Sequence, residues 1–130
     1  MKRIPLFLLV LTFAIFLFFH PVFLNQKIPF PGDILVGYAP WSSYSYSGYA
    51  PGGVPNKAQG IDVVRQLYPW KKLVIDEWKK GVVPLWNPYS FSGTPLLANY
   101  QTAAFYPFNI VFLLPFNIGW TIFIVLQPVL

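Results

Sequence analysis

The chain has no Asp, Glu, Lys, Arg or His after Lys80, so residues 81–130 have no charge to place on a surface facing water. A water-soluble fold carries charge on its surface to stay dispersed. The chain as a whole is 55% hydrophobic and 10% charged, whereas a soluble domain is about 25% charged. These features predict an all-α integral membrane protein.

Residues 1–24 have the pattern of a membrane anchor. The basic start Met1-Lys2-Arg3 precedes an apolar run from Ile4 to Leu24, which as one helix would reach about 30 Å, the thickness of a bilayer core. A cleaved signal peptide has a shorter apolar core that ends in small residues. The run here ends in His20-Pro21-Val22-Phe23-Leu24, which favours an uncleaved transmembrane helix over a signal.

The basic start also predicts the orientation. Lys2 and Arg3 favour a cytoplasmic N-terminus, so residues 25–104 form a long extracytoplasmic loop. Residues 105–130 are apolar again, and we interpret them as the start of a second transmembrane segment that is truncated. Prolines in such a segment need packed neighbours, and three occur here: Pro107, Pro115 and Pro128.

Within the loop, residues about 61–80 have the pattern of an amphipathic helix lying in the membrane interface. Pro69 cannot sit deep inside a helix, so the main helix is expected to start near it and to stop at Gly81. Asp76 and Lys80 stand four residues apart with the acid first, which is the favourable order for an ion pair. The predicted apolar stripe consists of Val63, Val64, Leu67, Trp70, Val74 and Trp78.

The residue types exclude several kinds of chemistry. Absence of cysteine removes disulfides, thiolate metal sites and cysteine nucleophiles. The chain has no glycine-rich phosphate loop, no histidine pair and no Ser/His/Asp set. The net charge of +5 comes without a basic run interleaved with aromatics, so we expect no nucleic-acid partner. Any activity therefore depends on carboxylates, with Arg or Lys holding a phosphate.

The acidic residues are not equivalent. Asp33 follows a Pro-Gly turn, where stabilising the turn is as consistent with the pattern as a functional role. Asp62 opens the helical stretch with Arg65 and Gln66 on the same face, and capping of the helix is the alternative there. The other two lie among lysines and are interpreted as solvated ion-pair partners: Asp76 and Glu77.

Several motifs together resemble the bacterial YfhO-type membrane proteins, and the resemblance covers nearly the whole chain as the N-terminal part of such a protein. The upstream element Phe30-Pro31-Gly32-Asp33 also fits their longer members. The main motifs are Asp62-x-x-x-Gln66-x-Tyr68-Pro69-Trp70, Gly81-x-x-Pro84-Leu85-Trp86-Asn87-Pro88-Tyr89, Gly93-Thr94-Pro95-Leu96-Leu97-Ala98-Asn99-x-Gln101 and Phe105-Tyr106-Pro107.

YfhO-type proteins resemble the GT-C superfamily of membrane glycosyltransferases, and the resemblance implies a multi-pass enzyme of the bacterial cytoplasmic membrane. Such an enzyme transfers sugar from a polyprenyl-phosphate donor to a cell-envelope glycopolymer, with membrane lipid as a further partner and a divalent cation as an optional cofactor. No residue is assigned as a metal ligand. By this resemblance Asp62 is the first catalytic candidate and Asp33 the second. The substrate-binding candidates are Arg65, Gln66, Lys71, Trp86, Asn87 and Tyr89, the last three of which alternatively shape the loop.

A non-catalytic alternative stays open at this point. A small membrane anchor could use its Trp-lined basic helix to recruit lipid or a partner. That hypothesis predicts that the 130-residue chain inserts stably by itself. The enzyme hypothesis predicts that this fragment alone is inactive.

Overall fold

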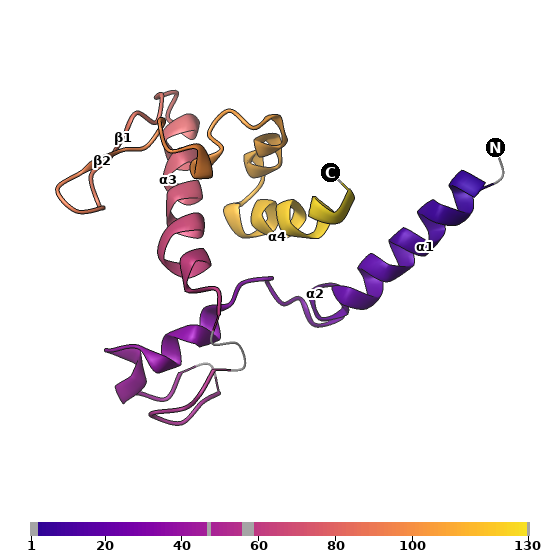
Figure 1. Cartoon of the computed structure of the whole chain (residues 1–130), viewed down its shortest axis with the longest axis horizontal. Helices are drawn as coiled ribbons and strands as arrows, with labels where there is room; N and C mark the ends of the chain where they lie inside the picture. The colour runs from indigo at the N-terminus through magenta and orange to yellow at the C-terminus, as the bar shows by residue number, and fades with distance from the viewer. Residues whose placement is uncertain (1–2, 47, 56–58, 130) are drawn as a thin grey trace. The chain divides into compact units, whose positions relative to one another are not determined.

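The computed structural model describes residues 3–46, 48–55 and 59–129 (Figure 1). Lys2, which entered the topology prediction, lies outside the described residues, as does the last residue of the predicted second segment, Leu130. The chain divides into two compact units, Met1–Pro29 with Pro107–Leu130 and Phe30–Tyr106.

The first unit begins with two helices, α1 (Arg3–Phe18) and α2 (His20–Asn25), where the sequence predicts one. In a continuous helix the residue at position 21 would donate its N–H to the carbonyl oxygen of Leu17, but Pro21 has no N–H. The His20 ring nitrogen Nδ1 lies 2.9 Å from that oxygen and supplies the missing donor. The break at Phe19 therefore has a local cause in the His-Pro pair.

The first unit continues with a 3₁₀ helix, Pro107–Leu113, and α4 (Phe116–Leu126). The buried Phe112 ring stacks on Phe116, with centroids 5.1 Å apart. Gly119 makes this packing possible, since a Cβ there would lie 2.8 Å from Cδ1 of Phe112. The indole Nε1 of Trp120 donates to the Pro29 carbonyl oxygen at 3.1 Å. A short 3₁₀ turn, Gln127–Val129, follows α4.

The prediction of two transmembrane helices is wrong, because no helix among the described residues is long and apolar enough to cross a membrane. The 16 residues of α1 reach about 24 Å at 1.5 Å per residue, and a bilayer core is about 30 Å thick. α4 has 11 residues. The predicted fold class, an all-α integral membrane protein with an interfacial helix, is therefore corrected to a mostly helical chain of two units, the second of which contains a short β-hairpin.

The second unit begins with a 3₁₀ helix, Gly32–Gly37, which buries Ile34 and Val36. A second 3₁₀ turn, Trp41–Ser43, follows. The chain then folds back on itself, because Tyr46 and Tyr49 exchange backbone hydrogen bonds of 3.1 and 2.9 Å.

The central element of the second unit is α3 (Tyr68–Lys79), which continues directly from a π-helical turn, Val63–Leu67. α3 begins one residue before Pro69, the position at which the sequence predicts the main helix to start. Gly81 adopts a φ of +75°, and its N–H donates to the Trp78 carbonyl oxygen at 2.9 Å. A left-handed glycine of this kind ends the helix where the sequence predicts a stop.

Two short strands follow α3 and form an antiparallel hairpin (Figure 1). β1 (Trp86–Asn87) pairs with β2 (Thr94–Pro95), so that Trp86 stands opposite Pro95 and Asn87 opposite Thr94. Gly93 has a φ of +106°, and a Cβ at this position would lie 2.5 Å from the Trp86 ring. A glycine is therefore required here for the indole to pack against the hairpin.

After the hairpin, a 3₁₀ turn (Tyr100–Thr102) leads into a segment that packs on α3. The indole Nε1 of Trp78 donates to the Ala104 carbonyl oxygen at 3.3 Å. The buried side of α3 coincides only in part with the predicted apolar stripe, since Val74 is buried whereas Leu67 and Trp78 are exposed. The residues of α3 that are buried are Lys71, Val74 and Ile75.

Candidate functional site

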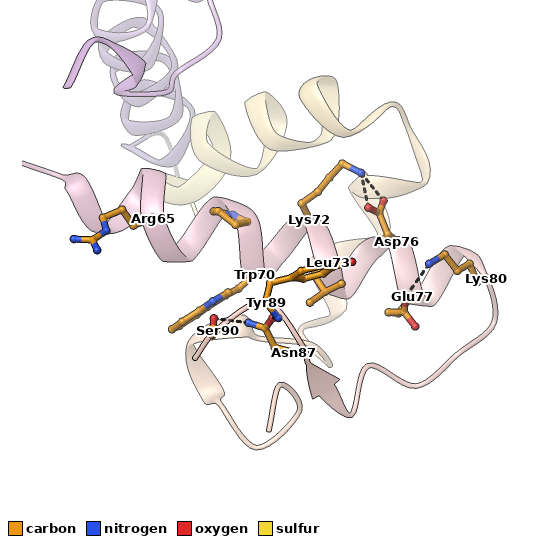
Figure 2. A pocket seen from close by; sticks show the side chains of 11 residues that line it. Arg65, Trp70, Lys72, Leu73, Asp76, Glu77, Lys80, Asn87, Tyr89 and Ser90 are labelled. Carbon is orange, nitrogen blue, oxygen red and sulfur yellow. Dashed lines mark hydrogen bonds and ion pairs between the residues drawn. The ribbon is translucent and has the colours of Figure 1, made fainter. Parts of the chain in front are cut away.

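The second unit contains a pocket of about 390 Å³ between α3 and the turn that follows β1 (Figure 2). The helical side of the pocket is mostly charged, whereas the turn supplies an amide, a phenol and a hydroxyl group. The lining residues are Arg65, Pro69, Trp70, Lys72, Leu73, Asp76, Glu77, Lys80, Asn87, Tyr89 and Ser90.

Helical spacing accounts for one wall. Residues three and four positions apart lie on the same face of a helix, and Pro69, Lys72, Asp76 and Lys80 follow this spacing along α3. Arg65 extends the wall from the preceding π-helical turn. One continuous helical face therefore presents most of the charged groups.

The buried Asn87 side chain shapes the other wall. Its Oδ1 accepts from the Tyr89 backbone N–H at 2.9 Å, and its Nδ2 donates to Ser90 Oγ at 2.9 Å. An Asn that bonds the backbone two residues ahead fixes a turn without further support. Asn87 thus positions Tyr89 and Ser90 against α3, as Figure 2 shows.

The charges of the pocket are arranged in pairs with one exception. Lys72 Nζ lies 2.5 Å from Asp76 Oδ2, and Lys80 Nζ lies 2.9 Å from Glu77 Oε1 (Figure 2). The predicted Asp76–Lys80 pair is therefore wrong, since both residues have other partners. Glu77 raises the pKa of Lys80 through its hydrogen bond and its charge. In the described part of the chain Arg65 forms no ion pair, so its guanidinium is available to an anion.

Three of the residues predicted as substrate contacts line this pocket: Arg65, Asn87 and Tyr89. The two predicted catalytic acids do not line it. Asp62 is exposed at the start of the π-helical turn, and its side chain makes no capping bond. Asp33 is half-buried in the first 3₁₀ helix and accepts a bond from the Tyr49 hydroxyl at 3.3 Å.

The remaining predicted contacts lie elsewhere in the second unit. Lys71 is 5% exposed, and its Nζ donates to the Thr102 carbonyl oxygen at 2.7 Å. Burial lowers the pKa of Lys71 from 10.5 to about 8. Gln66 is exposed on the π-helical turn, and the Trp86 ring packs against Gly93. Lys71 thus links α3 to the segment around Thr102 and does not line the pocket.

Sequence reasoning missed several of the pocket residues. The spacing of the charged side of α3 is a signal for Lys72, Asp76 and Lys80, but the pattern was interpreted only as a solvated face. No sequence signal shows that the turn at residues 87–90 folds back over that face. The pocket exists only because this turn lies against the charged face of α3.

The pocket does not fit a divalent cation. Hard cations of this kind take several oxygen ligands, but the pocket supplies only two carboxylates, Asp76 and Glu77, and the lysine ammonium beside each of them repels a cation. Nowhere in residues 3–46, 48–55 and 59–129 do three or more His, Cys, Asp or Glu side chains form a group that could hold a metal.

The resemblance to YfhO-type proteins stays a prediction. No family model, no curated protein and no solved structure matches this chain, and the pocket along α3 is therefore the main structural evidence for a function.

Proposed function

We propose that the pocket along α3 binds the sugar phosphate head of a polyprenyl-phosphate donor, and that the protein takes part in transferring this sugar to a cell-envelope glycopolymer. One observation carries the proposal. The pocket combines a guanidinium that forms no ion pair with the described residues, two aromatic rings and two carboxylates within about 390 Å³. Ligand pockets of small molecules fall in the range of about 300–1,000 Å³.

Arg65 is the residue that suits the phosphate. Its planar guanidinium can donate two parallel hydrogen bonds to phosphate oxygens, which a lysine cannot do. Lys72 and Lys80 keep the pocket net positive, because three cations stand against two carboxylates. An anionic ligand therefore gains a favourable field as well as a specific partner.

The aromatic and polar groups suit a sugar ring. Trp70 and Tyr89 present rings with a negative face, which attracts the polarised C–H bonds of a sugar. Carboxylate oxygens retain free lone pairs beside one ion pair, so Asp76 and Glu77 can accept bonds from sugar hydroxyls. Ser90 adds a hydroxyl from the turn.

The transfer itself needs a base beside the acceptor. The acceptor hydroxyl oxygen attacks the anomeric carbon, the bond from that carbon to the phosphate oxygen breaks, and polyprenyl phosphate leaves. A carboxylate takes the hydroxyl proton. In the pocket this role falls to Asp76 or Glu77, whereas the resemblance implies Asp62 or Asp33.

Binding of glucose 1-phosphate to the whole chain, measured by calorimetry, tests the proposed pocket. We expect it to bind more tightly than glucose or inorganic phosphate alone. Arg65→Gln should weaken binding by about tenfold or more, since a charge-assisted hydrogen bond contributes about 1.5–3 kcal/mol. Lys79→Gln, which removes a cation of α3 outside the pocket, is the matched control. Equal affinity in Arg65→Gln and the unchanged chain would contradict the pocket assignment.

A second experiment separates the candidate bases. Sugar incorporation into envelope polymer is measured in cells whose only copy of the full-length protein carries Asp76→Asn, Glu77→Gln, or Asp33→Asn with Asp62→Asn. Loss in the first two variants would assign the base to the pocket. Loss only in the double variant would assign it to the acids that the resemblance implies. Transfer retained in all of them would contradict a carboxylate-dependent transferase.

A further inference from the structure

The β1–β2 hairpin carries three exposed aromatic side chains, one on β1 and two in the turn that follows it. Phe91 is 100% exposed and Tyr89 is 83% exposed, and the Trp86 ring beside them is half-exposed. We call these three residues the aromatic tip. Large apolar side chains that are exposed together mark candidate interaction surfaces, so the aromatic tip is a candidate for contact with another phase or molecule.

The tip is held in place by the hairpin. The Gly93 N–H donates to the Ser90 carbonyl oxygen at 2.9 Å and closes the turn. Phe91 adopts a φ of +55°, a conformation that is unfavourable for a residue with a side chain. The hairpin therefore fixes the backbone in an unfavourable conformation that presents an uncovered ring.

Charge indicates what covers the tip. From Gly81 to Tyr106 the sequence has no charged residue, so inserting the hairpin into an apolar layer would bury no ion. Just before this stretch, Lys79 is the last residue of α3 and Lys80 is its C-cap. Aromatic rings beside lysines match the headgroup layer of an anionic lipid surface, where rings lie at the acyl boundary and cations meet phosphates.

We propose that the aromatic tip inserts into the headgroup layer of an anionic lipid surface. Only side chains of one hairpin enter the lipid in this arrangement. Tyr89 belongs both to the tip and to the lining of the pocket along α3, so insertion would bring the pocket to the lipid surface. This inference depends on the exposure of the tip and stands independently of what the pocket binds.

The chain has no cysteine, so a single introduced thiol can report on the tip alone. Phe91→Cys is labelled with an environment-sensitive fluorophore and mixed with vesicles of phosphatidylcholine and phosphatidylglycerol. We expect the emission to shift to shorter wavelength and to be quenched by spin-labelled lipid, more strongly than with phosphatidylcholine alone. Val54→Cys, at another exposed apolar side chain, should not shift. An unchanged spectrum at residue 91 on vesicle-bound protein would overturn the proposal.

A second variant tests the ring itself. Phe91→Gly removes the aromatic side chain and suits the positive φ, so the hairpin should remain folded. A label at Ser92→Cys should shift beside an intact Phe91 and lose the shift in Phe91→Gly. Persistence of the shift without the ring would overturn insertion by the tip. Binding of glucose 1-phosphate should be the same in both proteins, because Phe91 does not line the pocket, so this result is separable from the proposed function.

Discussion

The sequences of α1 and α3 suggest that α1 is the buried helix and α3 the exposed one, but the structure shows the opposite. α1 is apolar along nearly its whole length, yet none of its described side chains is buried. Five of the twelve residues of α3 are lysines or acids, yet Val74 is 0% exposed and Ile75 is buried with it. Burial in this chain therefore depends on a packing partner with matching spacing, and not on how apolar a helix is.

The partner of α3 comes from the sequence that follows it. Leu96, which follows β2, is buried, and the next segment places carbonyl oxygens of Thr102 and Ala104 within reach of Lys71 and Trp78. The described contacts of α1 include no comparable segment; Phe16 stacks on Phe23 of α2 at 5.6 Å. The difference between the two helices thus predicts different responses to the same substitution.

The largest expected effect comes from a charge placed on the buried side of α3. Val74→Asp buries a carboxylate without a partner, which should cost about 4 kcal/mol or more and unfold the second unit. Val10→Asp makes the same change on an exposed position of α1 and should alter the unfolding of the second unit by less than about 0.5 kcal/mol. Urea denaturation followed by tryptophan fluorescence measures both. Similar losses in the two variants would show that α1 also supports the second unit.

The local chemistry of α3 could be predicted from the sequence, because it depends on neighbours along the chain. Pro69 predicts the start of the helix and Gly81 its end, and α3 runs from Tyr68 to Lys79. The same reasoning was not applied to Pro21. The sequence was interpreted as one continuous helix because it is apolar, although Pro21 cannot donate a hydrogen bond to the Leu17 carbonyl oxygen. Hydrophobicity was given more weight there than backbone chemistry.

The candidate site could be predicted only in part. Arg65, Asn87 and Tyr89 were predicted from motifs and do line the pocket. Lys71 and Lys72 are adjacent lysines in the sequence, and spacing alone cannot tell which of them meets the carbonyl of Thr102. That distinction depends on where a segment thirty-one positions away along the chain packs.

The buried Lys71 on α3 should make the free energy of unfolding depend on pH. The pKa of Lys71 is about 8 in the folded chain and 10.5 without burial. Between these values the unfolded chain binds a proton that the folded chain does not, so stability should rise with pH from about 8 to about 10.5. The full rise is roughly 3 kcal/mol. Below pH 8 Lys71 is charged in both the folded and the unfolded chain, so it adds no further pH dependence to the stability.

Lys71→Met isolates this contribution, because it keeps a long side chain without a titrating group. Unfolding free energies of both proteins are measured across this pH range, and the difference between them should change with pH only through Lys71. A parallel pH dependence in the two proteins would contradict a buried, titrating Lys71.

The smallest expected effect on stability lies on the pocket side of α3. The side chains of Lys72 and Asp76 are 45% and 39% exposed, and exposed ion pairs contribute about 0–1 kcal/mol. Lys72→Gln should therefore change the unfolding free energy by less than about 1 kcal/mol, far less than Val74→Asp two residues further along the helix. The same variant removes one of three cations from the pocket and should weaken binding of glucose 1-phosphate. If Lys72→Gln lowers the stability but leaves the affinity for glucose 1-phosphate unchanged, this face of α3 stabilises the fold and does not bind the ligand.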